Sequence, residues 1–333
     1  MELRDEVVPR VGSHDVRVDA IASAISHGTE MLVFRGQIPD GLELDLPTLR
    51  GSFAFPIKYG YASVGRIAEV GADVGHLAVG DAVFVHHPHQ STYVVPAAMP
   101  IRLPDSLDPI LGVFLANVET ATNIVLDAAP RLGERVAVFG QGVVGLLITQ
   151  LLRRTGVSLI IAVDPLARRR ELACQVGADV ALAPAEVAAG NIRALSDEAG
   201  VDLAIEASGN AAALDQALDA VTFGGTVVVC SWYGTKPVSL TLGGAFHRRR
   251  LRIVSSQVST IDAALQPRWT MQRRLALARD LLPQLELKSL ISHRFSVEQA
   301  GAAFVLVDEH ADQTVQVLLT YAEAHAGYKG DSV

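Results

Sequence analysis

The stretch from Val136 to Asp164 limits the folds open to this chain more than any other, because it has the pattern strand, tight turn, helix, strand. It begins with the apolar run Val136–Phe139, which is typical of a strand buried in a parallel sheet. Gly140, Gly142 and Gly145 follow directly and complete a GxGxxG motif. This order of elements predicts a βαβ unit that binds a dinucleotide.

Each part of the motif has a physical task. The first glycine permits the sharp turn, the second lets the backbone approach a pyrophosphate, and the third lets the helix pack on the strand. The start of the helix, with Val143 and Val144, offers backbone N–H groups and the positive end of a dipole to the phosphates. The second strand ends at Asp164, where a carboxylate can accept hydrogen bonds from the adenosine ribose. The alternative is a glycine-rich turn in an ordinary α/β protein, with Asp164 as a helix cap.

The residues around this unit bear on which dinucleotide is bound. Asp164 favours NAD over NADP, because a 2′-phosphate would meet its negative charge. Arg168 and Arg169 lie just beyond and can weaken that preference, so NADP is the alternative. Three small residues follow later strand ends and are expected to line the cofactor crevice at the carboxyl edge of the sheet, namely Ser208, Gly209 and Ser231.

Composition narrows the class of protein. The chain has 333 residues, of which 50% are hydrophobic. Its net charge of −8 does not indicate the basic surface that binds nucleic acid. The N-terminus lacks the apolar core of a signal peptide, and no uninterrupted apolar run approaches the roughly 20 residues that span a bilayer. Cys174 and Cys230 have no zinc-type spacing. We expect a cytoplasmic protein that acts on a small molecule and has no nucleic-acid or membrane partner.

The order of patterns along the chain predicts three parts. Residues 1–120 are rich in short strands and glycine turns, as in a small irregular barrel. Residues 121–256 alternate strand and helix, which predicts a doubly wound parallel sheet covered on both faces. Residues 257–333 are expected to return to the first part. The predicted fold class is therefore α/β, with a Rossmann cofactor domain beside a β-barrel domain.

Several motifs in this order resemble those of the medium-chain dehydrogenase/reductase superfamily, which includes the zinc-type alcohol dehydrogenases. Gly28-Thr29-Glu30 is similar to the family's GTD turn, Gly60–Gly71 to its GHExxGxVxxVG strand, and Gly80-Asp81 to its GDxV motif. The resemblance covers nearly the whole chain and implies a GroES-like barrel, a nicotinamide cofactor and a homodimer. The His-Gly-Thr-Glu turn and Ser256-Gln257 resemble a subgroup that includes bacteriochlorophyllide hydroxyethyl dehydrogenase.

The departures from the family pattern concern zinc. The family's first zinc ligand corresponds to His27, its GHE histidine and glutamate to Tyr61 and Ala62, and its third cysteine falls near Ala116. A catalytic zinc ion needs three protein ligands, and only His27, with Glu119 as a second candidate, is of the right type. The family's structural four-cysteine lobe is missing too. We therefore expect no catalytic or structural zinc.

The cluster His86-His87-Pro88-His89 leaves a metal site open as an alternative. Three imidazoles in four positions can bind a metal ion, although Pro88 disturbs the alternation that would place His87 and His89 on one side. The other interpretation is ordinary loop histidines, with one of them lining the substrate cleft.

Without a metal, side chains must stabilise the substrate oxygen and move its proton. Tyr61 is the candidate donor to that oxygen, and Thr29 occupies the family's proton-relay position. His27 and Glu119 are alternative proton carriers. The relay histidine of some relatives would fall at Leu32, so that path looks broken. The structural alternatives are a packed aromatic at Tyr61, a turn residue at His27 and an acid near a helix start at Glu119.

These residues support three functions. The first is a zinc-independent NAD(P)-dependent dehydrogenase that transfers hydride between nicotinamide and a secondary alcohol or ketone. The second is a quinone or enoyl reductase, which needs no metal. The third is a dinucleotide-binding protein without turnover. Thr29 and Asp164 favour the first, whereas the missing zinc ligands favour the other two.

Overall fold

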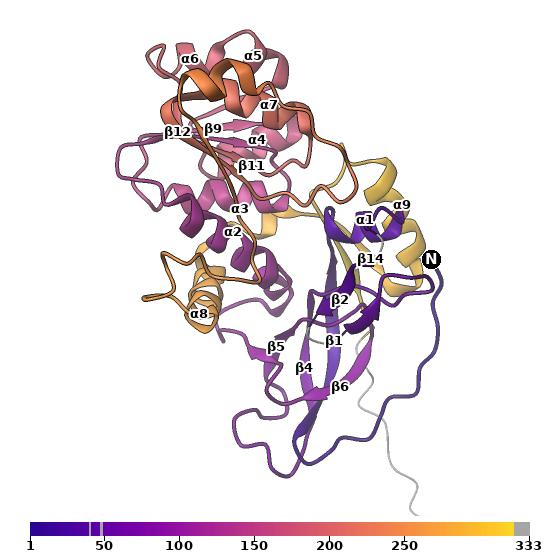
Figure 1. Ribbon diagram of the computed structural model, residues 1–333. Coiled ribbons are helices and arrows are strands. Elements are labelled where there is room, and N and C mark those ends of the chain that lie inside the picture. Colours follow the sequence, from indigo (N-terminus) through magenta and orange to yellow (C-terminus); the bar gives the residue numbers. More distant parts are fainter. Residues whose placement is uncertain (40, 47–48, 323–333) are drawn as a thin grey trace, which may run out of the picture. The chain divides into compact units, whose positions relative to one another are not determined.

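The computed structural model describes residues 1–39, 41–46 and 49–322 (Figure 1). These residues divide into two compact units. Unit 1 contains the described parts of 1–26, 41–114 and 291–322, and unit 2 contains 27–39 and 115–290. Each unit has its own sheet.

Unit 2 is built on a six-stranded sheet in which every neighbouring pair is parallel. The strand order reverses at β8, because β9 and β10 lie on one side of it and β11 to β13 on the other. Ligands of open parallel sheets bind at such a reversal, outside the carboxyl ends of the strands. In sheet order the strands are β10 (Val180–Leu182), β9 (Leu159–Val163), β8 (Arg135–Phe139), β11 (Val201–Glu206), β12 (Val221–Val229) and β13 (Arg252–Ser255).

Helices cover both faces of this sheet (Figure 1). On one face α3 (Val143–Leu152) packs against α2 (Leu115–Ala128) and α4 (Ala167–Val176). On the other face α7 (Ala211–Ala220) contributes Leu214, Ala217 and Leu218 to a core with the strands. The short helices α5 (Pro184–Ala188) and α6 (Asn191–Ala194) lie near α7. The sheet is therefore doubly wound, which confirms the predicted fold class.

Unit 1 contains a sheet of seven strands among its described residues. Strand β1 is its centre, because it pairs with β4, β6 and β15, in each case antiparallel. Register shifts between β1 and β4 give the irregularity expected of a small barrel. The strands are β1 (Asp15–Ile25), β4 (Ser63–Val70), β5 (Ala82–Val85), β6 (Thr92–Pro96), β7 (Ile101–Arg102), β14 (Ile291–Ser296) and β15 (Gln316–Thr320).

The remaining elements are short. Helix α1 (Thr29–Phe34) and helix α8 (Met271–Leu281) belong to unit 2, whereas α9 (Ala300–Glu309) belongs to unit 1. Residues 39–55 lack periodic features in the sequence but contain the hairpin strands β2 (Glu43–Leu46) and β3 (Leu49–Ser52). Positions 40, 47 and 48 of that segment lie outside the described residues.

The boundaries of the units differ from the predicted ones. The sequence pattern places the divisions after residues 120 and 256. The chain passes between units at Ser26/His27, again between residues 39 and 41, at Phe114/Leu115 and at Leu290/Ile291. Residues 257–290 stay with the cofactor sheet because α8 packs on α2. Apolar patterning alone does not reveal that contact.

Within the part of the chain that the structure describes, one run is long and apolar enough to cross a membrane by length and composition. It is Pro109–Ala128, which joins a 3-10 turn to α2. Of its most apolar window, 67% is buried inside the fold. A core helix of a folded domain has this character.

Candidate cofactor-binding and active site

The glycine turn after β8 lies at the strand reversal and depends on the absence of side chains. Gly140 has φ +94°, and a Cβ there would lie 2.7 Å from the backbone N and Cα of Ser208, after β11. A Cβ on Gly145 would lie 1.9 Å from the carbonyl oxygen of Gly140. The first glycine thus makes the turn, and the third lets α3 pack against it, in the roles that the sequence predicts for them.

The second glycine of the motif occupies open space. Gly142 is the N-cap of α3, and a Cβ built on it meets no atom within 4 Å. Having no side chain, it leaves the first N–H groups of α3, at Val143, Val144 and Gly145, without a side-chain cap. An uncapped helix start beside open space suits an anionic group such as a pyrophosphate.

Asp164 lies at the end of β9, beside this turn, and is only 3% exposed. Its Oδ2 accepts a hydrogen bond from the backbone N–H of Gln141 at 2.8 Å, and its Oδ1 accepts one from Leu166 at 2.9 Å. The carboxylate therefore fixes the glycine turn to the start of α4. Each carboxylate oxygen has a further lone pair, so these bonds are compatible with accepting ribose hydroxyls.

The arginines after Asp164 differ in their surroundings. Arg168 is exposed and Arg169 is half-buried, both in the first turn of α4. Arg170 was not singled out in the sequence. Its Nη1 donates to the carbonyl oxygens of Asp164 and Pro165 at 2.8 and 2.9 Å. Arg170 therefore binds the backbone of the loop between β9 and α4.

The loops after β11 and β12 are joined at the same edge of the sheet. Ser231 Oγ accepts a hydrogen bond from the Gly209 N–H at 2.9 Å. Ser208 is exposed, and its N–H and hydroxyl both donate to Glu206 Oε1, at 2.7 and 2.6 Å. The Gly209 N–H donates to the same oxygen at 2.9 Å. Ser208, Gly209 and Ser231 thus form one hydrogen-bonded group.

Glu206 was missed in the sequence, although an acid inside the apolar run Val201–Ala207 is an available signal. It is fully buried, and its Oε2 has no hydrogen-bond partner among the described residues. Burial, with the charge of Glu206 as a second cause, raises the pKa of both Tyr233 and Cys230 well above their usual values. Both groups therefore stay protonated at neutral pH and cannot serve there as a phenolate or a thiolate.

Thr29 lies in unit 2, although its motif belongs to the barrel part of the family pattern. It is half-buried and begins α1. A Cβ on Gly234, in the loop after β12, would lie 2.8 Å from the Gln37 carbonyl and 3.6 Å from Leu32. The segment that carries His27 and Thr29 therefore packs on a loop at the carboxyl side of the cofactor sheet. Residues far apart in the sequence meet here.

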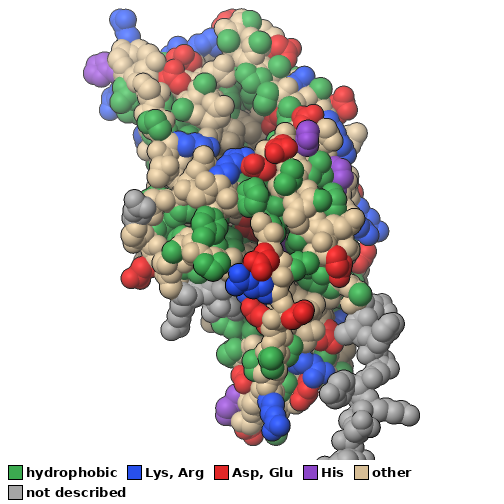
Figure 2. Space-filling model, turned by 90° about the vertical axis from the view of Figure 1, so that its right-hand side faces the viewer, with side chains coloured by type: hydrophobic (Ala, Val, Ile, Leu, Met, Phe, Trp, Pro, Cys, Tyr) green, Lys and Arg blue, Asp and Glu red, His purple; other side chains and the backbone are tan. Residues whose placement is uncertain are grey.

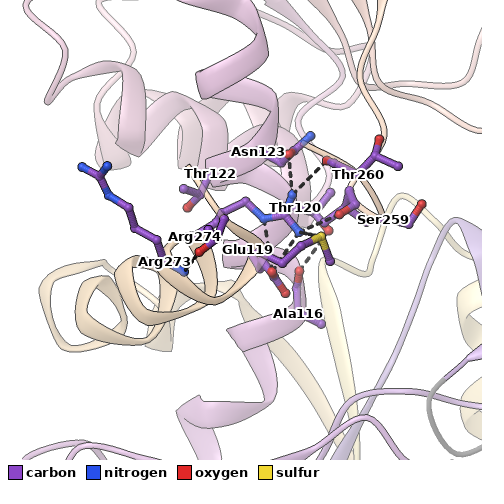
Figure 3. Close-up of polar contacts among 12 residues, drawn as sticks. Ala116, Glu119, Thr120, Thr122, Asn123, Ser259, Thr260, Arg273 and Arg274 are labelled. Atoms are coloured by element: carbon purple, nitrogen blue, oxygen red, sulfur yellow. Dashed lines mark hydrogen bonds and ion pairs between the residues drawn. The ribbon is translucent and has the colours of Figure 1, made fainter. Parts of the chain in front are cut away.

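Glu119 is held in a buried ion pair (Figure 3). Its Oε1 accepts hydrogen bonds from Arg274 Nε and Nη2, at 3.1 and 2.9 Å. Arg274 Nη1 also donates to Asn123 Oδ1 at 2.6 Å, and its guanidinium reaches the carbonyl oxygens of Val258 and Thr260. Figure 3 shows Arg274 pointing toward α2, whereas the neighbouring Arg273 points away.

A half-buried acid, Asp127, extends this network. Asp127 accepts hydrogen bonds from Asn123 and from the Ser256 hydroxyl, at 2.8 and 2.6 Å. Burial raises the pKa of Asp127 above its usual value, while these two hydrogen bonds oppose the shift. The loop after β13 is thus attached directly to α2 at Ser256, and through Arg274 of α8 at Val258 and Thr260. This anchoring is a structural task for Glu119 that competes with its predicted role as a proton carrier.

Tyr61 belongs to unit 1 and is half-buried. The histidine cluster holds the segment that carries it, since His86 Nδ1 donates to the Tyr61 carbonyl oxygen at 3.2 Å and the His89 N–H donates to the Tyr59 carbonyl at 3.2 Å. The ring of Tyr59 makes an edge contact with that of Tyr61, with centroids 6.5 Å apart. This packing is compatible with either the catalytic or the structural interpretation of Tyr61.

The three histidines of the cluster, His86, His87 and His89, contact different residues. His87 stacks on Tyr93 with ring centroids 3.7 Å apart, and its Nδ1 donates to the Pro88 carbonyl. Burial lowers the pKa of His87 to about 4, so its imidazole is neutral at pH 7. His89 Nδ1 bonds to Ser23.

The donor set does not fit a catalytic zinc ion. Over residues 1–39, 41–46 and 49–322 no group of three or more His, Cys, Asp or Glu side chains is placed to hold a metal. At the positions that correspond to the family's ligands stand His27, Tyr61, Ala62 and Ala116, of which only His27 is a usual zinc ligand. Glu119, the candidate second ligand, accepts from Arg274 instead.

Known proteins resemble this chain over most of its length. D-guloside 3-dehydrogenase of Escherichia coli (strain K12) is 30% identical over 329 residues, which is 93% of each chain. A solved structure from Sinorhizobium meliloti 1021, bound to NADP, superposes with a TM-score of 0.75 at 24% identity and 95% coverage of both chains. Another, from Escherichia coli CFT073 with NADH, gives a TM-score of 0.76 at 21% identity, covering 95% of this chain and 94% of that one.

The family profile described as "Zinc-binding dehydrogenase" matches residues 143–271. That range covers most of the cofactor domain but none of the positions 27, 61, 62 and 116, so the match carries no information about zinc ligands. The similarity to D-guloside 3-dehydrogenase extends over 93% of both chains and therefore shows the family to which this chain belongs. The chain is a member of the medium-chain dehydrogenase/reductase superfamily, among its zinc-type alcohol dehydrogenase-like proteins.

Proposed function

We propose that this protein is an NAD(P)-dependent dehydrogenase that interconverts a secondary alcohol and a ketone without zinc. The observation that carries the proposal is the uncapped start of α3 at Gly142, next to the buried Asp164 carboxylate at the strand reversal. That combination suits the pyrophosphate and adenosine ribose of a nicotinamide dinucleotide. Such a cofactor, when bound, accepts or donates the hydride.

The nature of the substrate is proposed from the relative. The name D-guloside 3-dehydrogenase describes oxidation of a ring hydroxyl, which is a secondary alcohol, in a glycoside. At 30% identity over 93% of both chains, an alcohol of this general type is our first candidate here. A quinone or an enone is the second candidate, favoured by the donor set that does not fit zinc. The third is cofactor binding without turnover.

The proposal assigns the following roles to residues of this chain. Tyr61 would donate a hydrogen bond to the substrate oxygen, and Thr29 would take part in proton transfer. His27 and Glu119 are alternative proton carriers, although the ion pair with Arg274 favours a structural task for Glu119. Asp164 would favour NAD over NADP, and Arg168 and Arg169 would weaken that preference.

We also propose a cytoplasmic homodimer with a small-molecule substrate and neither a nucleic-acid nor a membrane partner. Strand β13 is an edge of the cofactor sheet and all its residues are exposed, including Ile253 and Val254. An exposed apolar edge can continue into the same edge of a second copy. Figure 2 shows acidic and basic side chains interspersed on the face drawn, which supports a partner other than a polyanion.

The test is turnover by the purified protein with NAD, NADP and their reduced forms. The panel contains methyl hexosides, simple secondary alcohols, their ketones, quinones and enones, each assayed before and after chelator dialysis. Oxidation of an alcohol that survives removal of bound metal supports the proposal. Loss on chelation with recovery on added zinc contradicts the zinc-free part. Cofactor binding without turnover on the whole panel favours the third candidate, and light scattering measures the dimer.

A further inference from the structure

The segment 256–260 follows β13 at the carboxyl edge of the cofactor sheet, and polar side chains fasten it there. The Ser256 N–H donates to the Val229 carbonyl oxygen of β12 at 2.9 Å. The Ser256 hydroxyl donates to Asp127 Oδ2 at 2.6 Å and accepts from Asn123 Nδ2 at 3.1 Å. The first residue of the segment is therefore joined both to the sheet and to α2.

Arg274 of α8 fastens the rest of the segment (Figure 3). Its Nη2 donates to the Val258 carbonyl oxygen at 2.6 Å, and its Nη1 donates to the Thr260 carbonyl oxygen at 3.3 Å. The same guanidinium donates to Glu119 and Asn123 of α2. Arg274 is fully buried, and each of its three guanidinium nitrogens has an acceptor. One buried cation thus sets the position of two loop carbonyls relative to α2.

The cost of this arrangement indicates a positional task. Removing a guanidinium and a carboxylate from water carries a desolvation penalty, and apolar side chains of similar volume often give equal or greater stability. An ion pair provides direction that apolar packing does not, because the planar guanidinium donates at fixed angles. The carbonyl oxygens of Val258 and Thr260 are therefore held in one arrangement.

A series of contacts within unit 2 joins the glycine turn to this segment along the carboxyl edge. A Cβ on Gly140 would lie 2.7 Å from the backbone of Ser208, after β11. The next N–H, that of Gly209, donates to Ser231 Oγ after β12. Ser256 bonds in turn to the end of β12. Neighbouring strands lie about 4.8 Å apart, so the ends of β11, β12 and β13 fall within about 15 Å of β8.

The strand order determines which half of a dinucleotide these ends would face. The uncapped start of α3 follows β8, and Asp164 follows β9, on the side of β8 away from β13. With the pyrophosphate at α3 and the adenosine ribose at Asp164, the nicotinamide half would extend the other way, toward β11, β12 and β13. The segment 256–260 is therefore on the nicotinamide side of the edge.

We propose that Arg274 is a positioning residue for the nicotinamide half of the cofactor, because it holds the segment 256–260 in the shape that receives that half. The inference rests on the proposed dehydrogenase function, since it needs a nicotinamide dinucleotide at the strand reversal. Arg274 acts through the carbonyl oxygens of Val258 and Thr260 and has no contact with the cofactor. Its effect is expected on the nicotinamide half and not on the adenosine half.

The experiment compares binding of NADH with binding of ADP, which has the adenosine and the pyrophosphate but lacks the nicotinamide riboside. Arg274→Lys keeps a positive charge for Glu119, but a single ammonium group cannot also reach both loop carbonyls. Ser256→Ala frees the segment from Asp127 and leaves the ion pair intact. Arg273→Lys is the matched control, because Arg273 is exposed and points away from α2. Calorimetric titration measures each dissociation constant.

Arg274→Lys and Ser256→Ala should each raise the NADH dissociation constant about tenfold and leave the ADP dissociation constant within about twofold of the parent value. Arg273→Lys should change neither. Retained ADP affinity shows that the cofactor sheet is folded, so a general loss of structure does not produce this split. Where Arg274→Lys does not fold, Ser256→Ala carries the test.

Two results would overturn the positioning role alone, given a parent protein that binds NADH. The first is an unchanged NADH affinity in the folded variants, and the second is an equal loss of affinity for NADH and for ADP. A parent protein that does not bind NADH would instead overturn the proposed function, and this inference with it.

Discussion

The guanidinium of Arg274 and the carboxylate of Glu119 meet inside unit 2, where Nε and Nη2 donate to the single oxygen Oε1. Arg274 is fully buried and Glu119 is 8% exposed. A buried charge is tolerated only when partners satisfy it, and the partners here also include the carbonyl oxygens of Val258 and Thr260. The pair therefore ties the loop after β13 to α2.

Arg274→Met should lower the free energy of unfolding by about 3 to 5 kcal/mol, because it leaves the Glu119 carboxylate and two loop carbonyls without their donor. Urea denaturation measures the loss. The matched control is Arg273→Met, since the exposed Arg273 stacks 4.2 Å from the Trp269 ring centroid and points away from α2. The control should cost at most about 1 kcal/mol. Equal losses in both variants would contradict the anchoring role.

Glu119→Gln distinguishes the two interpretations of this residue. If its task is structural, the variant should lose about 1 to 3 kcal/mol of stability and keep turnover within a few-fold of the parent. If Glu119 carries a proton in the reaction, kcat should fall about a hundredfold or more. Stability by urea denaturation and kcat on the same preparation separate these outcomes, and we expect the first.

Substitutions at two motif glycines should have different effects, one on cofactor binding and the other on stability. Gly142→Ala adds a methyl group to open space, so the thermal midpoint should stay the same while the NADH dissociation constant rises about tenfold or more. Gly145→Ala sets a methyl group 1.9 Å from the Gly140 carbonyl, which should cost about 3 kcal/mol or more. Unchanged NADH affinity in Gly142→Ala would place the pyrophosphate elsewhere.

Asp164→Asn should reduce the preference for NAD over NADP about tenfold, because the negative charge that repels a 2′-phosphate is removed. The variant should also lose about 1 to 3 kcal/mol of stability, since a single amide oxygen cannot accept from both Gln141 and Leu166 in the same geometry. Ratios of kcat/KM for the two cofactors measure the preference. Arg168→Ala is the opposing control, for which NADP should become the poorer cofactor.

His87 makes the stability depend on pH. Burial lowers its pKa from the usual 6.5 to about 4, although a hydrogen bond to the Pro88 carbonyl opposes the shift. Below about pH 6.5 the unfolded chain binds a proton at this imidazole and the folded chain does not. Its contribution is therefore complete above that pH and is lost as the pH falls to about 4, by about 3 kcal/mol.

Urea unfolding at a series of pH values between 7 and 4 measures this loss. His87→Phe keeps an aromatic ring against Tyr93 and removes the titrating group, so its stability should change less over the same range. A parallel decline in both proteins would assign the effect to other groups.

Much of the cofactor unit was predictable from local patterns. The spacing of Gly140, Gly142 and Gly145 between two apolar runs determines a strand, a turn and a helix, because backbone conformation and close packing at those points exclude other residues. The predicted strand Val136–Phe139 and the predicted strand end at Asp164 lie within one residue of β8 and of the end of β9. Membership in the dehydrogenase superfamily also followed from such motifs.

The sequence by itself thus determined the order of strands and helices, the phosphate-binding turn and the family. Only the tertiary structure decided which distant side chains meet, such as Glu119 with Arg274, 155 positions apart, and Ser23 with Tyr321, 298 positions apart. A glycine turn is a property of neighbouring residues and leaves a local pattern. A buried hydrogen bond or ion pair depends on which elements pack together, and neither partner's own neighbourhood in the chain records the other.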